Sequence, residues 1–183
     1  MKPKDNLMHD HKKIEVMLGI LTKIGENIRK HQNPVLEEID QIIEFLRLFA
    51  DKLHHGKEET IYFPALFEYG MANENSPAAV MLFEHEVGRG YIRDMASAVE
   101  SLKKGEKNAA NLLAESIESY VELMENHILK ENTILFSIGD KLIPPPKQEI
   151  LYKDCQLMDS KFGEDQHQRF NELLHQLEKK YLA

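Results

Sequence analysis

The chain has 183 residues, of which 42% are hydrophobic and 30% charged, as is typical of one globular domain with a hydrophobic core. Its net charge of −8 argues against binding to nucleic acid or to an anionic membrane, because both need clustered Lys and Arg side chains. A single cysteine, Cys155, excludes an internal disulfide framework and any metal site with several thiolate ligands.

No apolar run approaches the ~20 residues that span a bilayer. The charged N-terminus lacks the apolar stretch of a signal peptide, so we expect a cytoplasmic protein. The motifs GxxxxGK[ST], GxGxxG and GxSxG are absent, and nothing therefore predicts nucleotide binding or serine hydrolase chemistry. The positions of the nine histidines are the most informative feature that remains.

Apolar residues recur at helical spacing along the chain, and no long stretch alternates with the period of two that indicates a β-strand. The first helix is predicted from about Asp5 to about Lys30. Asn33 and Pro34 then have the character of an N-cap and a first helical residue. The second helix that they begin must bend near Pro64, which lacks a backbone N–H.

The third helix is predicted to begin at Ser76-Pro77, with the same cap chemistry, and to end near Gly105. A fourth helix carries an apolar stripe from Leu113 to Ile138. Four long helices with short connections predict an all-α protein, an antiparallel up-down four-helix bundle.

The run Pro144-Pro145-Pro146 is predicted to stop helix formation and to form a stiff extended linker. Beyond it, the sequence from Gln166 to Tyr181 predicts one additional amphipathic C-terminal helix that packs back on the bundle. A role in dimerisation or in binding a protein partner is the alternative for this helix. We therefore divide the chain into a metal-binding bundle of residues 1–140 and a C-terminal region of residues 141–183.

Two segments of the chain resemble each other. The segment HHGKEETIYF, residues 54–63, aligns with HILKENTILF, residues 127–136, and both share His, Lys-Glu, Thr-Ile and Phe at the same offsets. Each segment is preceded, on the previous helix, by an acidic residue and a histidine: Asp10-His11 and Glu84-His85. The chain is therefore interpreted as two copies of a helix pair, with one His on the first helix and His-x-x-x-Glu on the second.

Residues four apart on a helix project from the same face. Six residues of the duplicated pattern lie on the apolar stripes: His11, His54, Glu58, His85, His127 and Glu131. Burying four imidazoles and two carboxylates is costly without strong partners. Two divalent metal ions would supply them, with bridging carboxylates and terminal imidazoles. The alternative is a set of hydrogen-bonded core groups or ion pairs on helix surfaces.

Imidazole together with carboxylate suits iron, manganese or zinc and disfavours calcium and magnesium, which prefer oxygen ligands. Six ligands shared between two ions leave coordination positions open, which favours iron over a closed structural zinc site. His55 and Glu59 repeat the His-x-x-x-Glu spacing one residue later but align with Ile128 and Asn132. We expect both to support the site from outside or to lie at the surface, with direct ligation as the alternative.

In this order and spacing, the sequence resembles the hemerythrin family, specifically the bacterial and archaeal HHE cation-binding domains, over about residues 5–140. The motifs that carry the resemblance are Asp10-His11, the segment from His54 to Pro64, Glu84-His85-Glu86 with Arg89, and the segment from His127 to Asn132. The resemblance implies a four-helix bundle with a non-haem di-iron centre. Its ligands map onto His11, His54, Glu58, His85, His127 and Glu131, with Glu58 and Glu131 as the bridges.

Oxygen-carrying hemerythrins place a second His one turn after the ligand on the third helix, where this chain has Arg89. The resemblance therefore implies a site without a fifth imidazole, similar to family members associated with iron–oxygen or nitric oxide chemistry, redox sensing or repair of iron centres. We expect Arg89 to point to solvent or to pair with Glu86 or a carboxylate on a neighbouring helix, and contact with a metal-bound anion is the alternative.

These observations predict two bound iron ions, with manganese or zinc as alternatives. We expect a protein that binds or senses a small oxidant (O2, NO or peroxide) and has neither nucleic acid nor membrane as a partner. The alternatives are a di-iron oxidase or peroxidase, and an iron-centre repair or iron storage protein. Whether the protein is an enzyme is left open by the sequence.

Overall fold

The computed structural model describes residues 1–183 as an all-helical protein without a β-strand. The first half consists of α1 (Pro3–Arg29), α2 (Leu36–Phe45), the π-helical segments η1 (Leu46–His55) and η2 (Glu58–Tyr62), and α3 (Phe63–Glu68). The second half consists of α4 (Pro77–Lys103), α5 (Ala109–Lys130), the π-helical segment η3 (Glu131–Leu135) and α6 (Phe136–Leu142). Two further helices, α7 (Pro145–Phe162) and α8 (Glu164–Tyr181), complete the chain.

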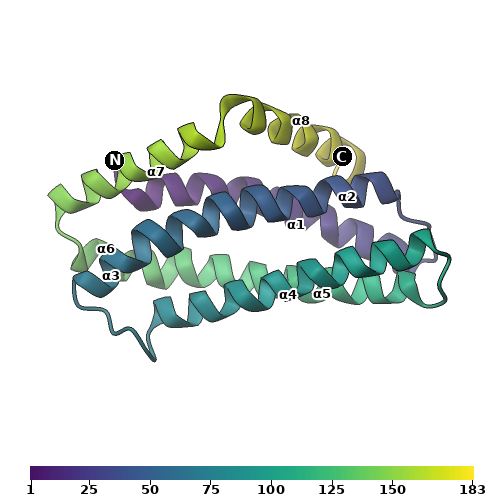
Figure 1. Ribbon diagram of the computed structural model, residues 1–183, viewed down its shortest axis with the longest axis horizontal. Coiled ribbons are helices and arrows are strands. Elements are labelled where there is room, and N and C mark those ends of the chain that lie inside the picture. Colours follow the sequence, from purple (N-terminus) through teal and green to yellow (C-terminus); the bar gives the residue numbers. More distant parts are fainter.

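The long helices lie side by side along the long axis of the molecule and form a bundle (Figure 1). Helix α5 packs against α1 and α4, and α2 packs against α4. Along the helices, the larger core, with Phe45, Met95 and Ile117, lies to one side of the polar residues of the motifs. A smaller core with Phe63 and Phe136 lies on the other side. The polar residues of the motifs are thus placed between two apolar clusters that hold the helices together.

The helix beginnings follow the sequence pattern only in part. The predicted cap at Ser76 is confirmed, since its Oγ accepts a hydrogen bond from the backbone N–H of Ala79 at 3.3 Å. The predicted cap at Asn33 is wrong, because α2 begins at Leu36 with Val35 as its N-cap residue. Residues 32–35 are not helical, because they connect the end of α1 to the start of α2.

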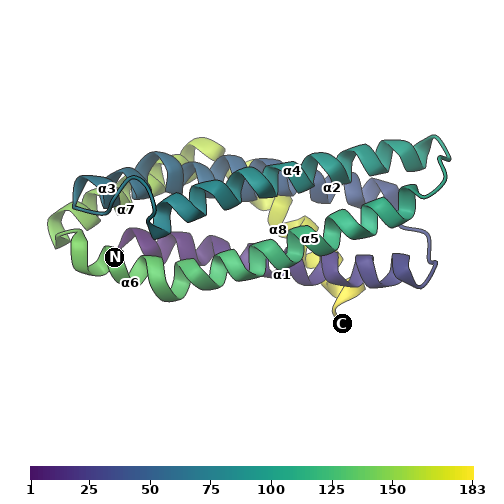
Figure 2. The ribbon, with the colours of Figure 1, turned by 90° about the horizontal axis from the view of Figure 1, so that it is seen from below.

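The extended linker predicted at the proline run is also wrong. Pro145 and Pro146 form the first turn of α7, where a missing backbone N–H removes no helical hydrogen bond. Helices α7 and α8 meet at Gly163, whose φ of +97° suits glycine. They pack against α1, on the side of the bundle away from α4 and α5 (Figures 1 and 2). The apolar side of α8 is covered by the bundle, since Phe170 and Leu174 belong to the larger core.

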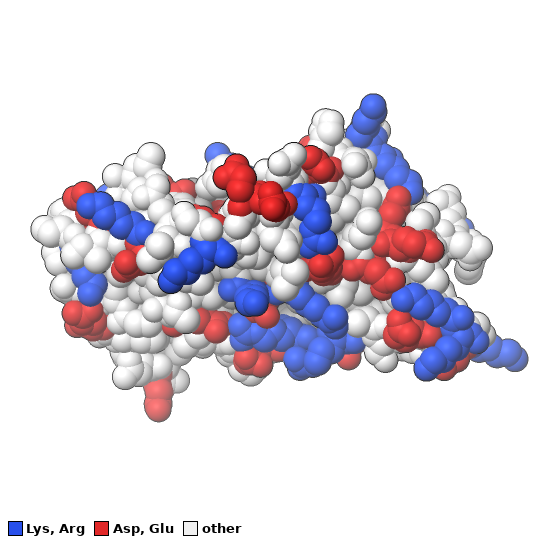
Figure 3. All heavy atoms as spheres, turned by 45° about the horizontal axis from the view of Figure 1, so that its top comes forward, with Lys and Arg blue, Asp and Glu red and all other residues white.

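The face that carries α7 and α8 shows Lys and Arg side chains interspersed with Asp and Glu (Figure 3). Two ion pairs on this side join α8 to α2, Arg169 with Glu44 at 2.9 Å and Lys180 with Glu38 at 2.7 Å. None of the helices combines the length and the apolar character that crossing a membrane requires.

Candidate metal centre

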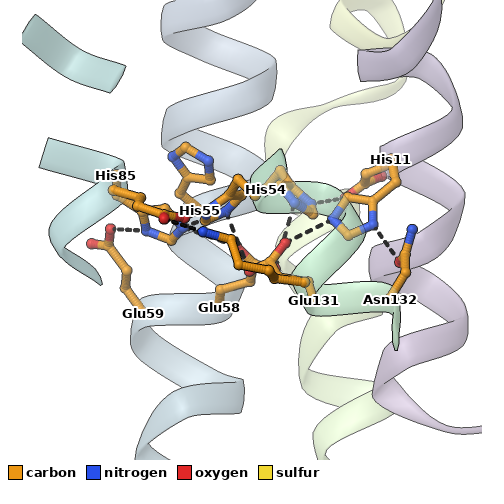
Figure 4. A network of polar contacts seen from close by, with 12 residues as sticks. His11, His54, His55, Glu58, Glu59, His85, Glu131 and Asn132 are labelled. Carbon is orange, nitrogen blue, oxygen red and sulfur yellow. Dashed lines mark hydrogen bonds and ion pairs between the residues drawn. The ribbon is translucent and has the colours of Figure 1, made fainter. Parts of the chain in front are cut away.

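Five imidazoles and two carboxylates meet inside the bundle (Figure 4). They form two groups, one of His55, Glu58, His85 and His127 and the other of His11, His54, Glu58 and Glu131. Within each group the nearest ligand atoms all lie within 4.8 Å of one another, and every residue is buried. Two ligands on opposite sides of an ion at ~2.1 Å are about 4.2 Å apart, so each group has nearly the size of a metal coordination sphere.

Each of the two carboxylates faces both groups of histidines. The Oε1 and Oε2 atoms of Glu58 lie 3.5 Å from Nε2 of His54 and 3.5 Å from Nε2 of His85. The two oxygens of Glu131 lie 3.2 Å from Nε2 of His11 and 3.3 Å from Nε2 of His127. This is the arrangement that a carboxylate needs in order to bridge two ions.

These carboxylates lack the hydrogen bonds that a purely structural role would require. None of the four oxygens of Glu58 and Glu131 has a hydrogen-bond partner, and neither does Nε2 of His11. A buried polar group left in this way costs about 1–3 kcal/mol, and more when it is charged. Cations between the carboxylates and the imidazoles would satisfy all of these atoms, so the donor set fits a pair of metal ions.

Every imidazole is held at its Nδ1 atom by a side chain outside the cluster. The partners are Asn132 for His11 (2.8 Å), Asp10 for His54 (3.2 Å), Asp51 for His55 (3.2 Å), Glu59 for His85 (2.7 Å) and Glu84 for His127 (2.9 Å). Outer hydrogen bonds of this kind fix the ring orientation and leave Nε2 for the metal, as is usual for histidine ligands.

The outer contacts follow the duplication of the sequence. In each copy, an acidic residue directly precedes the histidine of the first helix. This acidic residue contacts a lysine and also the histidine of the second helix. The two resulting chains of contacts are Lys57–Asp10–His54 and Lys130–Glu84–His127. The acidic residues at these positions are therefore positioned to orient metal ligands.

The local backbone explains how the ligands reach the interior. Glu58 and Glu131 each begin a five-residue π-helical segment, η2 and η3. A π-helix has more residues per turn than an α-helix, so neighbouring side chains point in more similar directions, and such segments are frequent at functional sites. In the first copy, η1 ends at His55 and both His54 and His55 face the cluster. The equivalent stretch of α5 is α-helical, and Ile128 belongs to the larger core.

A fifth imidazole, which the six expected ligands do not include, therefore lies in the cluster. His55 stacks on His85 with ring centroids 3.7 Å apart, and it joins the cluster from η1 rather than from α4. The adjacent histidines at positions 54 and 55 are the sequence signal for this imidazole. On a regular α-helix, however, a rotation of about 100° per residue would turn His55 away from the cluster that His54 faces. Glu59 lies outside the cluster and supports His85, as expected.

Arg89 does not face the histidine cluster. Its guanidinium donates hydrogen bonds to Asp51, Glu59 and Glu86. The expectation that Arg89 pairs with Glu86 or a neighbouring carboxylate is thus confirmed. Because Asp51 holds His55 and Glu59 holds His85, the guanidinium links the outer partners of two imidazoles.

Burial and the concentrated charges shift pKa values within the cluster in both directions. Burial alone would lower the pKa of His127, but the carboxylates of Glu131, Glu84 and Glu58 together outweigh this effect and raise the pKa to about 10. Burial and the positive charge of His85 lower the pKa of His55 well below its usual range. A lowered pKa favours the neutral imidazole, which is the form that binds a metal.

The outer carboxylates remain ionised. Burial would raise the pKa of Asp10, yet the hydrogen bond with His54 and the charge of Lys57 lower it to about 2. Asp51 behaves in the same way, because its contacts with His55 and Arg89 outweigh burial and lower its pKa to about 2. Both groups can accept a hydrogen bond from an imidazole N–H at neutral pH.

Comparison with known proteins gives one family match. The profile described as Hemerythrin HHE cation binding domain matches residues 2–138. The uncharacterized proteins Rv1995 and MT2051 of Mycobacterium tuberculosis and Mb2018 of Mycobacterium bovis are each 26% identical to this chain over 174 residues. The alignments cover 92% of this chain and 62% of each relative, so the chain spans less than two thirds of their length. No solved structure matches the chain.

Proposed function

Because this chain belongs to the hemerythrin HHE cation-binding domain family, we propose that it holds two iron ions and uses them to bind or sense a small oxidant, O2, NO or peroxide. The observation that supports this most strongly is the position of Glu58 and Glu131. Their oxygens face both groups of histidines and form no hydrogen bond. An iron pair, when bound, supplies coordination of small ligands and exchange of electrons with them.

We infer that the two metal positions are not equivalent. One position has three imidazoles, His55, His85 and His127, and the other has two, His11 and His54, while Glu58 and Glu131 serve both. The second position has fewer protein ligands, so we place the binding of the small oxidant there.

Apolar side chains lie beside the position with two imidazoles. The ring of His11 stacks on Phe136 with centroids 5.8 Å apart, and Tyr62 packs edge-on against Phe136 at 5.5 Å. Leu7, on the same helix as His11, is fully buried. Such an apolar shell limits the access of water and favours small, weakly polar ligands over larger polar substrates.

We also infer that the bundle has the antiparallel up-down order of the family, which the short connections from α1 to α2 and from α4 to α5 support. The division of the chain near residue 140 and a cytoplasmic location remain predictions.

The proposed function is tested by loading the full chain with Fe(II) under anaerobic conditions. Elemental analysis should give two iron ions per chain, and Mössbauer and optical spectra should change on addition of O2, NO or H2O2. Fewer than two ions, or two ions that respond to none of these molecules, would contradict the proposal. Catalytic consumption of peroxide with a reductant would instead favour the oxidase or peroxidase alternative.

A further inference from the structure

The two series of contacts, Lys57–Asp10–His54 and Lys130–Glu84–His127, differ in the partners of the lysine. Lys57 is fully buried, forms an ion pair with Asp10 at 2.5 Å, and donates hydrogen bonds to Asn6 and to Asp159 of α7, both at 2.8 Å. The side chain of Lys130 is 36% exposed, and its ion pair is with Glu84 alone. Only the lysine of the first copy therefore pairs with a C-terminal helix.

The approach of α7 at this point is close. Asn6 donates from Nδ2 to the second oxygen of Asp159 at 2.6 Å. A Cβ atom added at Gly56 would lie 3.4 Å from Cε of Met158, so α7 passes directly over this glycine. The aligned residue of the second copy is Leu129, which is 59% exposed. A leucine side chain at position 56 would extend into the space that α7 occupies.

The charges of Lys57, Asp10 and Asp159 indicate how the contact with α7 affects His54. The ammonium group of Lys57 withdraws negative charge from Asp10, which accepts the hydrogen bond from His54. Asp159 shares the ammonium group, so Asp10 keeps more of its strength as an acceptor. A stronger acceptor at Nδ1 makes Nε2 a better metal ligand and holds the ring in place.

We propose that Asp159 is a positioning residue for the metal site, and that docking of α7 raises the metal affinity of the position at His11 and His54 but not of the position with three imidazoles. This inference rests on the proposed function. Helix α7 lies outside residues 2–138, so the family match does not account for the contact.

The test compares Asp159→Asn with Asp154→Asn in the full chain. Both changes remove one charge from α7, but Asp154 is exposed, whereas Asp159 contacts Lys57. In anaerobic Fe(II) titrations, Asp159→Asn should weaken one of two stepwise affinities about tenfold, the lower end of the effect seen for outer-sphere partners of metals. The other affinity should stay unchanged, and His54→Ala should abolish the step that Asp159→Asn weakens.

A second readout uses the reciprocity of coupled equilibria. If docking of α7 strengthens iron binding, iron must strengthen docking of α7 by the same factor. Addition of Fe(II) should therefore slow hydrogen exchange of the α7 amides in the natural chain and slow it less in Asp159→Asn. Gly56→Leu, which copies Leu129, should displace α7 and weaken the same affinity.

The outcomes separate this inference from the proposed function. Unchanged affinities in Asp159→Asn, equal weakening of both steps, or the same effect from Asp154→Asn would overturn the inference while two ions still bind. A natural chain that binds no iron would overturn the proposed function, and this inference with it.

Discussion

The two copies that form the metal centre share most of their outer contacts, but residues 54–63 and 127–136 differ at four aligned positions, and three of these change the site. The pairs are His55 and Ile128, Gly56 and Leu129, and Glu59 and Asn132. The first difference gives one position a third imidazole, and the second leaves room for α7 beside one copy only. The third difference places a carboxylate on His85 but a neutral amide on His11. The duplication thus provides a symmetric frame, and a few substitutions within it make the two positions unequal.

The largest effect is expected for Glu58→Ala, because Glu58 belongs to both groups of ligands. The variant should retain neither iron ion after anaerobic loading and desalting, as measured by elemental analysis. Glu59→Ala is the control, since Glu59 lies one residue away and contacts only outer atoms of the site. Equal loss of iron from both variants would contradict the assignment of Glu58 as a bridge.

His55→Ile makes the first copy like the second, where Ile128 is accommodated in the core. Loss of an imidazole should weaken iron binding at one position by at least ~100-fold, since even outer-sphere partners account for 10–100-fold. Fe(II) titration should then show one strong step instead of two. His9→Ile, at an exposed histidine of α1, is the control. Two unchanged steps in His55→Ile would place His55 outside the metal site.

Asn132→Asp should make the two copies more alike in their outer contacts. A carboxylate in place of the amide oxygen, 2.8 Å from Nδ1 of His11, strengthens this imidazole as a ligand. We expect about tenfold tighter iron binding at the position with two imidazoles, and a lower reduction potential of the loaded protein. Redox titration followed by optical absorption provides the measurement, and an unchanged potential would argue against an electronic role for the contact.

The smallest effect is expected for Arg89→Leu. The guanidinium contacts Asp51 and Glu59 rather than the ligands themselves, so both iron ions should still bind. Affinity at the position with three imidazoles should fall less than the ~10-fold expected for a direct outer partner. Azide titration of the oxidised protein should give an unchanged affinity. A large loss of azide binding would show that Arg89 contacts an anion at the metals.

The sequence predicted most of the cluster because a duplication repeats the ligands at fixed helical spacing. It gives direct ligation by His55 only as an alternative, since the direction of this side chain depends on a π-helical backbone that residue spacing does not reveal. Helix α7 was missed for a different reason. The proline run predicts a linker, although proline is also favoured in the first helical turn. The contacts of Lys57 with Asp10 and Asp159 come from distant segments, so only the folded chain shows them.

The central claim is that two inequivalent iron ions are bridged by Glu58 and Glu131. Anomalous diffraction at the iron absorption edge, from crystals of the anaerobically loaded chain, tests this claim most directly. We predict two peaks, one beside His55, His85 and His127 and the other beside His11 and His54, with both carboxylates between them. A single peak, or two peaks that lack a shared carboxylate, would contradict the account.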